Sequence, residues 1–317
     1  FIAILILFLS IGSISAADVP LDVDTTDQIN NAFNDGTTVH SGDTVYLGNK
    51  TFTTDGSWGQ VLITLPTNLN NIVINGGTID NPNSYSTFKN NCQLFNIQGA
   101  NVTFLNIHFK SNGNYNPYDN PNFIVNSAGF IRFVNCSFED LNAGVIDVQS
   151  GTDLEINNCQ LKNFNTDAYN KPLIKYKGTG NLNITNNTFS NYNRQNNPIF
   201  DLNVNGNSIC IQDSNFINIS ASALTNFNTG TNVEEFVMKN NKFNNVNSNN
   251  NNPLINIGTV NNDFIFFNNN FTNVGASSGL IVSGSSKNYI VSNCSFNMVT
   301  SSLFNFYQGS KGIRANN

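Results

Sequence analysis

The sequence predicts an all-β fold, a right-handed single-stranded parallel β-helix of about ten coils. An apolar-x-apolar-x-Asn-x-x-apolar pattern recurs along the chain, as in Phe264 to Phe271, and its copies begin 23 to 30 residues apart. Within each copy the apolar residues alternate, which is the pattern of a strand with one buried face. A second apolar segment recurs between the copies, as in Ile199 to Leu202. Each period thus has two clear strands and a short third one, as around Phe164. Three short strands per period indicate stacked coils, in which each strand pairs with its equivalent one period later.

The copies have Asn, or in one case Asp, at the point where the chain must bend between two strands. Asn tolerates the left-handed backbone conformation that a sharp bend requires. Stacked amides also hydrogen-bond to one another from one coil to the next. We therefore expect an inward-facing structural ladder formed by Asn106, Asn135, Asn158, Asn186, Asp213, Asn240, Asn268 and Asn293.

The first 17 residues are expected to be a signal peptide. An apolar run is followed by small residues at Ala16 and Ala17, as signal peptidase requires, and the run is too short to span a bilayer. The usual Met and basic residues do not precede it, so we expect the chain to belong to a longer polypeptide. An exported chain of this kind is secreted or held at the cell surface.

Residues 18–60 are expected to form a capping helix and the first strands, and residues 61–317 the β-helix repeats, as one elongated domain. The segment from Thr26 to Gly36 has an N-cap candidate, apolar residues at helical spacing and a Gly stop. An amphipathic helix at this point would cover the open end of the apolar stack, which otherwise exposes core residues and unpaired strand edges.

Three N-terminal motifs and the later Asn-Asn-x-Phe copies carry a resemblance to a known family. The motifs run from Ile29 to Phe33, from Gly42 to Leu47 and from Ile63 to Ile79. Together they resemble the parallel β-helix domains, of the pectate-lyase-like superfold, found in adhesin-like surface proteins of methanogenic archaea. The resemblance covers nearly the whole chain and implies an archaeal, cell-surface repeat protein. This chain departs from larger members of the family in showing no membrane segment or other anchor at its end.

Composition and charge exclude several kinds of partner. Asn makes up roughly a fifth of the chain, and Phe recurs in register, which distinguishes the sequence from a disordered one. The net charge is -6 and no Lys/Arg cluster stands out, so nucleic acid is not expected as a partner. No Cys/His spacing indicates a metal site or a cofactor. Cys136 and Cys159 occupy equivalent positions in successive coils, where stacked small core residues are expected and a disulfide would fit poorly.

The loops that follow the third strand of each coil should emerge on one edge of the β-helix. This edge would present aromatic and basic side chains among many Asn residues. Flat aromatic faces and fixed amides are what sugar recognition requires, although Tyr and Asn also serve simply to make loops soluble. We expect a carbohydrate-binding edge that includes Tyr115, Tyr118, Tyr169, Tyr192 and Arg194.

Asp147, Lys175 and Asp201 occupy one outward position in three successive coils. A carboxylate, an amine and a carboxylate in a row would suit acid-base chemistry on an acidic polysaccharide. The other interpretation is a column of alternating charge that avoids contacts between like charges. Arg132 over Glu155 repeats this theme on another face.

No clustered Asp with Arg, Lys or His resembles the motifs of β-helix pectate lyases or polygalacturonases, so the sequence favours binding over catalysis. We expect an adhesin-like or structural module that binds an extracellular glycan or another cell's envelope. The alternative is a polysaccharide lyase or glycoside hydrolase that acts through Asp147, Lys175 and Asp201.

Overall fold

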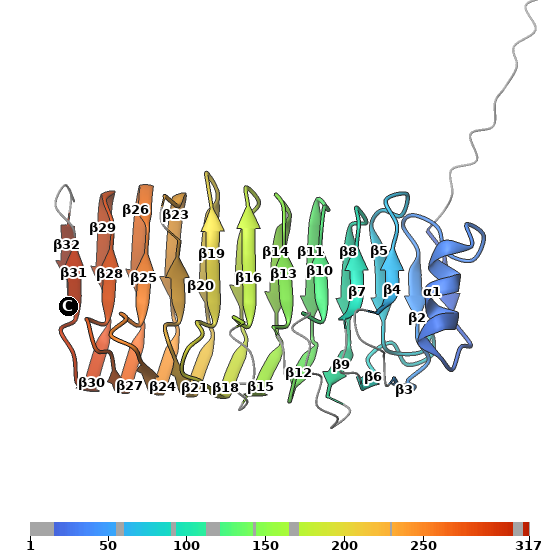
Figure 1. The fold of residues 1–317 in the computed structure, drawn as a ribbon, viewed down its shortest axis with the longest axis horizontal. Helices are drawn as coiled ribbons and strands as arrows, with labels where there is room; N and C mark the ends of the chain where they lie inside the picture. Colours follow the sequence, from blue (N-terminus) through green and yellow to red (C-terminus); the bar gives the residue numbers. More distant parts are fainter. Residues whose placement is uncertain are drawn as a thin grey trace, which may run out of the picture.

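The computed structural model describes residues 16–54, 60–89, 93–111, 121–141, 144–164, 171–228, 230–306 and 313–316. It confirms the parallel β-helix. Strands of successive coils lie side by side along one axis and form three long sheets (Figure 1). All pairings between these strands are parallel, and the core lies between the sheets. The expected signal peptide falls on residues outside the described part of the chain, apart from its last two positions.

The three sheets are named A, B and C. Sheet A contains β1 (Asp18–Pro20), β2 (Thr44–Tyr46), β5 (Ile72–Asn75), β8 (Val102–Leu105), β11 (Phe130–Val134), β14 (Asp153–Asn157), β17 (Leu182–Thr185), β20 (Ser208–Gln212), β23 (Asn232–Lys239), β26 (Thr259–Phe267), β29 (Ser286–Ser292) and β32 (Ile313–Asn316). Sheet B contains β3 (Thr51–Thr53), β6 (Ser86–Lys89), β9 (Ile107–Lys110), β12 (Ser137–Glu139), β15 (Gln160–Phe164), β18 (Thr188–Arg194), β21 (Asn215–Ala221), β24 (Lys242–Ser248), β27 (Asn270–Gly275) and β30 (Ser295–Val299). Sheet C contains β4 (Val61–Leu65), β7 (Gln93–Ile97), β10 (Phe123–Val125), β13 (Ile146–Val148), β16 (Ile174–Gly178), β19 (Phe200–Val204), β22 (Thr225–Phe227), β25 (Ile255–Ile257), β28 (Ile281–Ser283) and β31 (Phe304–Phe306).

The helix α1 (Thr26–Asn34) lies at the N-terminal end of the stack (Figure 1). Its N-cap is Thr25, whose hydroxyl accepts the Gln28 amide, while the Gln28 side chain accepts the Thr25 amide, so both groups are satisfied. The helix buries Ile29 and Phe33 and packs against β4. The expected capping helix is therefore present, and its apolar face covers the first coil.

Equivalent side chains stack in columns along the core. In sheet B, successive rings of one column lie 4.4 to 5.2 Å apart, between coil neighbours that the register pairs directly. Stacking of this kind adds to the burial of the rings themselves. This column consists of Phe189, Phe216, Phe243, Phe271 and Phe296. The coil register read from the sequence is thus confirmed.

The predicted ladder exists, but it faces outward. Asn135 donates to Asn106 at 2.6 Å and Asn186 donates to Asn158 at 3.2 Å, and every predicted member has φ between 52° and 57°. Of the eight members only Asn106 is buried. The expectation of an inward column is wrong because the left-handed residue reverses the alternation at the bend and points its side chain away from the core. The remaining amide contacts join Asn158 to Asn135, Asn240 to Asp213, Asn268 to Asn240 and Asn293 to Asn268.

From Asn135 onward, the residue after each ladder position belongs to an inward row of Cys, Asn and Ser side chains, which we call the inward polar row. Cys136 and Cys159 are buried free thiols, as expected for stacked core residues, and the Cys136 amide donates to Cys159 Sγ. In the next coil the buried Asn187 accepts the Cys159 amide at 2.8 Å and donates to the Ile156 carbonyl at 2.7 Å. Further along, Asn241 and Asn269 repeat this arrangement. These side chains satisfy backbone groups that the bend removes from the strand ladders.

A second outward ladder, which the sequence analysis missed, lies within five consecutive strands of sheet B, from β15 to β27. Asn191 donates to Asn163 at 3.0 Å, and Asn245 donates to Asn218 at 3.0 Å. Its members also have positive φ, so they turn the chain as the first ladder does. The signal was an Asn five residues after each of the five first-ladder positions from Asn158 to Asn268. The full set is Asn163, Asn191, Asn218, Asn245 and Asn273.

Replacing Asn187 with Leu should lower the free energy of unfolding by about 3 kcal/mol, because the Cys159 amide and the Ile156 carbonyl both lose their buried partner. Asn187→Ser, which introduces the residue found at the equivalent Ser214, should lose less. Urea unfolding of the two variants and the parent chain measures this difference. A Leu variant as stable as the parent would show that the inward row does not stabilise the bend.

Candidate functional site

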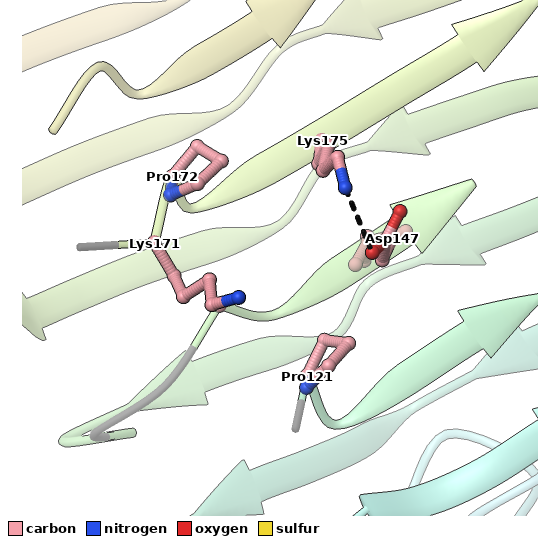
Figure 2. A pocket seen from close by; sticks show the side chains of 7 residues that line it. Pro121, Asp147, Lys171, Pro172 and Lys175 are labelled. Atoms are coloured by element: carbon pink, nitrogen blue, oxygen red, sulfur yellow. Dashed lines mark ion pairs between the residues drawn. The ribbon is translucent and has the colours of Figure 1, made fainter. Parts of the chain in front are cut away.

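Asp147, Lys175 and Asp201 lie in one column on the outer face of sheet C, as the sequence predicted. The register pairs Asp147 with Lys175 and Lys175 with Asp201 in β13, β16 and β19. Lys175 Nζ lies 3.6 Å from Asp147 Oδ2, and both side chains line a hollow whose rim includes Pro121, Lys171 and Pro172 (Figure 2). The cavity in this hollow has a volume of about 30 Å³, which suits a water molecule and excludes a sugar ring.

Asp147 has the most unusual environment of the three. Burial raises the pKa of its carboxyl, against the attraction of Lys175, which lowers it. Its Oδ1 atom is buried and has no hydrogen-bond partner among the described residues. A carboxyl with a raised pKa beside an amine could exchange a proton with a substrate, but only a small group can reach it through this hollow.

Asp201 does not continue the ion pair. Its Oδ1 accepts hydrogen bonds from Asn226 Nδ2 at 3.1 Å and from Asn228 Nδ2 at 3.4 Å. Asn256 donates in turn to Asn226 at 3.4 Å, so the charged column passes into a column of amides. The three residues are therefore in register but do not act as one acid-base group.

The amide column lies in an open groove of about 610 Å³, a volume in the range of small-molecule sites. One wall is held by Asn250, whose amide donates to Asn196 Oδ1 at 2.9 Å and to the Gln195 carbonyl at 3.1 Å across two coils. We call this the sheet C groove, and its lining consists of Pro172, Asn196, Asn197, Pro198, Asp201, Asn226, Asn228 and Asn250. Amide and carboxylate groups at fixed positions can pair with sugar hydroxyls as donors and acceptors. The sequence analysis identified the loops but not these asparagines.

Tyr192 and Arg194 do not belong to an exposed binding edge. Tyr192 is 1% exposed and its hydroxyl donates to the Pro198 carbonyl at 3.2 Å. Arg194 is 0% exposed, and its Nη2 donates to the Leu141 carbonyl at 2.6 Å with the guanidinium over the Phe164 ring. The expectation is corrected because β18 continues through both residues after the bend at Asn191 and turns their side chains inward.

The other expected binding residues, Tyr115, Tyr118 and Tyr169, lie outside the described residues.

The second pair of opposite charges expected from the sequence is present on sheet A. Arg132 Nε lies 3.1 Å from Glu155 Oε2. Within the described part of the chain, no three His, Cys, Asp or Glu side chains come together as a metal centre would require. No helix in that part is long and apolar enough to cross a membrane.

Comparisons with known proteins show the fold and no family. No family profile and no curated protein sequence matches the chain. Among solved structures, the PL6 family alginate lyase AlyGC matches with a TM-score of 0.55 and 14% sequence identity over 95% of this chain. A point mutant of the same enzyme matches with a TM-score of 0.56 and 15% identity over 95% of this chain. The chain spans 39% of the length of that enzyme, and the likeness identifies a shared β-helix fold.

Asp147→Asn should stabilise the protein at neutral pH. A carboxyl whose pKa is raised in the folded state opposes folding once it is ionised, and below its ordinary value of 3.8 this cost disappears. The urea midpoint of the variant should therefore exceed that of the parent at about pH 7 and equal it at about pH 3. A variant that is less stable than the parent at neutral pH would show that the Lys175 pair outweighs the burial of the carboxylate.

Proposed function

We propose that this chain is an exported, adhesin-like β-helix module that binds an extracellular glycan in the sheet C groove. The observation that carries the proposal is the groove itself, in which amides from three coils and the Asp201 carboxylate face one open volume. Asp201 and Asn226 lie in strands of sheet C, and hydrogen-bonding groups held in a rigid sheet need little reorganisation on binding, which favours affinity. The proposal keeps the glycan partner expected from the sequence and moves its site from the tyrosine-bearing loops to the asparagines of β22 and the adjoining turns.

The chemistry of the groove favours an uncharged, hydroxyl-rich sugar chain. Its described lining contains amides, two prolines at the loop ends and one carboxylate, and no cationic side chain. Asp201 accepts from Asn226 and Asn228, so the carboxylate orients both amides. This leaves their second N–H groups and the Asn228 side-chain carbonyl for a ligand, while the Asn226 carbonyl already accepts from Asn256. An acidic sugar would be repelled by Asp201 at this position.

A polysaccharide lyase or hydrolase remains the second candidate function. Two observations favour it, namely the Asp147–Lys175 pair with a carboxyl of raised pKa and the likeness of fold to an enzyme that is named an alginate lyase. The size of the hollow beside Asp147 speaks against it, as does the diversion of Asp201 to neighbouring amides.

Asn226→Ala combined with Asn228→Ala should weaken glycan binding at least tenfold, since loss of one or two net hydrogen bonds is worth about 1.4 kcal/mol or more. A glycan array identifies the sugar that binds the parent chain, and calorimetry with that sugar compares the variants. Asn183→Ala, which removes an exposed amide from the outer face of sheet A, is the matched control and should bind as the parent does.

Two outcomes would contradict the binding proposal. One is an array on which no glycan binds the parent chain. The other is release of reducing or unsaturated sugar ends from a panel of neutral and acidic polysaccharides, with turnover lost in Asp147→Asn. The second outcome would establish the enzyme instead.

A further inference from the structure

The outer face of sheet B contains a second hollow, whose lining side chains differ in chemistry from those of the sheet C groove. His108, Ser137 and Gln160 are register partners in β9, β12 and β15. Ser137 is much smaller than the two residues above and below it, so the column is interrupted at its position. The resulting cavity has a volume of about 250 Å³, and we call it the Ser137 hollow.

Aromatic and amide groups wall the hollow on one side. The Tyr85 ring meets the His108 ring edge to face with centroids 4.5 Å apart. The Tyr85 hydroxyl accepts a hydrogen bond from Asn135 Nδ2 at 2.7 Å, although the two residues are fifty positions apart in the sequence. Tyr85 is thereby fixed across two coils. Asn158 completes this wall at the bend.

A charged column borders the other side. The register places Lys110, Glu139 and Lys162 in successive coils. Glu139 lies 3.4 Å from the Lys110 ammonium and 3.7 Å from the Lys162 ammonium, so one carboxylate is shared between two cations. The group therefore has one positive charge in excess, in a protein whose net charge is -6. Lys162 and Glu139 both line the hollow.

His108 is the group in the hollow whose charge can change near neutral pH. No hydrogen bond joins its ring nitrogens to another of the described residues, so they are available to a ligand. Burial lowers the pKa of His108 below 6.5, and Lys162 and Lys110 lower it further while Glu139 raises it. At neutral pH the ring is therefore uncharged, and it gains a proton only as the pH falls below 6.5.

We propose that the Ser137 hollow is a binding site for one acidic sugar unit, carrying a carboxylate or a sulfate. The excess ammonium charge of Lys110 and Lys162 would attract the anion. The Tyr85 ring would contact the sugar face, and Gln160, Ser137 and Asn158 would pair with hydroxyls. The volume is smaller than that of drug-sized sites, which matches a single ring. This site goes beyond the proposed function, because the sheet C groove lacks cations among its described lining.

The affinity for an acidic sugar should rise as the pH falls through the pKa of His108. The titratable groups that face His108 are Tyr85 on the preceding segment, Lys110 on its own strand, Glu139 on β12 and Lys162 on β15. His108 gains its charge only as the pH falls below 6.5, because burial lowers its pKa, and a uronate stays ionised there. His108→Gln should abolish the dependence on pH and keep the affinity that the parent shows at about pH 8.

The experiment is an NMR titration of the full chain with glucuronate, glucose 6-sulfate and glucose, following the His108 ring signal. The signal is assigned by its loss in His108→Gln, since His40 is the other histidine. Both acidic sugars should shift it saturably and glucose should not, and their relative affinities distinguish a carboxylate site from a sulfate site. Lys162→Met should weaken binding about tenfold.

Two further variants keep the test independent of folding. Lys242→Met removes an exposed lysine from the same face of sheet B, in the column of Gln160 but three coils away, and should leave binding unchanged. Ser137→Leu fills the hollow from an outward strand position and should abolish binding without affecting glycan binding in the sheet C groove. Equal shifts by glucose and glucuronate, no shift by either acidic sugar, or equal losses in Lys162→Met and Lys242→Met would each overturn the proposal.

Discussion

The whole structure depends on the parallel pairing of each strand with its equivalent one coil later. A coil cannot bury its own apolar face, because its three short strands leave both ends of the apolar layer open. Backbone pairing fixes the register, and the register then places like residues in contact, as in the Phe216 and Phe243 rings at 4.9 Å. The same constraint acts on the surface, where it turns single residues into columns of amides and charges.

The fold could be predicted from the sequence because the residue types repeat with a regular period. Alternating apolar positions and a bend asparagine recur often enough to define strands, bends and register together. The sequence did not show which way the bend side chain points. A left-handed residue breaks the alternation of inward and outward side chains, so Asn186 faces out while Asn187 faces in. A strand rule of period two fails at such a position.

The candidate sites were predicted in part. The register read from the sequence correctly placed Asp147, Lys175 and Asp201 in one column. Register does not show whether neighbours in a column form an ion pair, because that depends on which amides lie beside them. Asn226 and Asn228 take Asp201 out of the charged row. Tyr192 was assigned to the loop edge although it aligns with the apolar Ile219 of the next coil, and this alignment was the better guide to its burial. The hollow at Ser137 could not be predicted, since it arises from side-chain size within one column and from Tyr85, which reaches across two coils.

Surface function in such a scaffold follows from local exceptions to the repeat. Where a column is regular, its side chains bond to one another and leave little for a ligand, as in the two asparagine ladders. Where an amide column meets a charged one, or a small residue interrupts large ones, groups are left facing an open volume. The sheet C groove and the Ser137 hollow are both sites of this second kind.

Register is best tested with spin labels on Glu155 and Asn183, which are direct partners in β14 and β17. Cys92 and the half-buried Cys210 and Cys294 would be replaced by Ser for this purpose. In-register parallel neighbours lie about 5 Å apart, so the double-labelled chain should show strong spin-exchange broadening. A spectrum equal to the sum of the two single-label spectra would contradict the stacking on which every column described above depends.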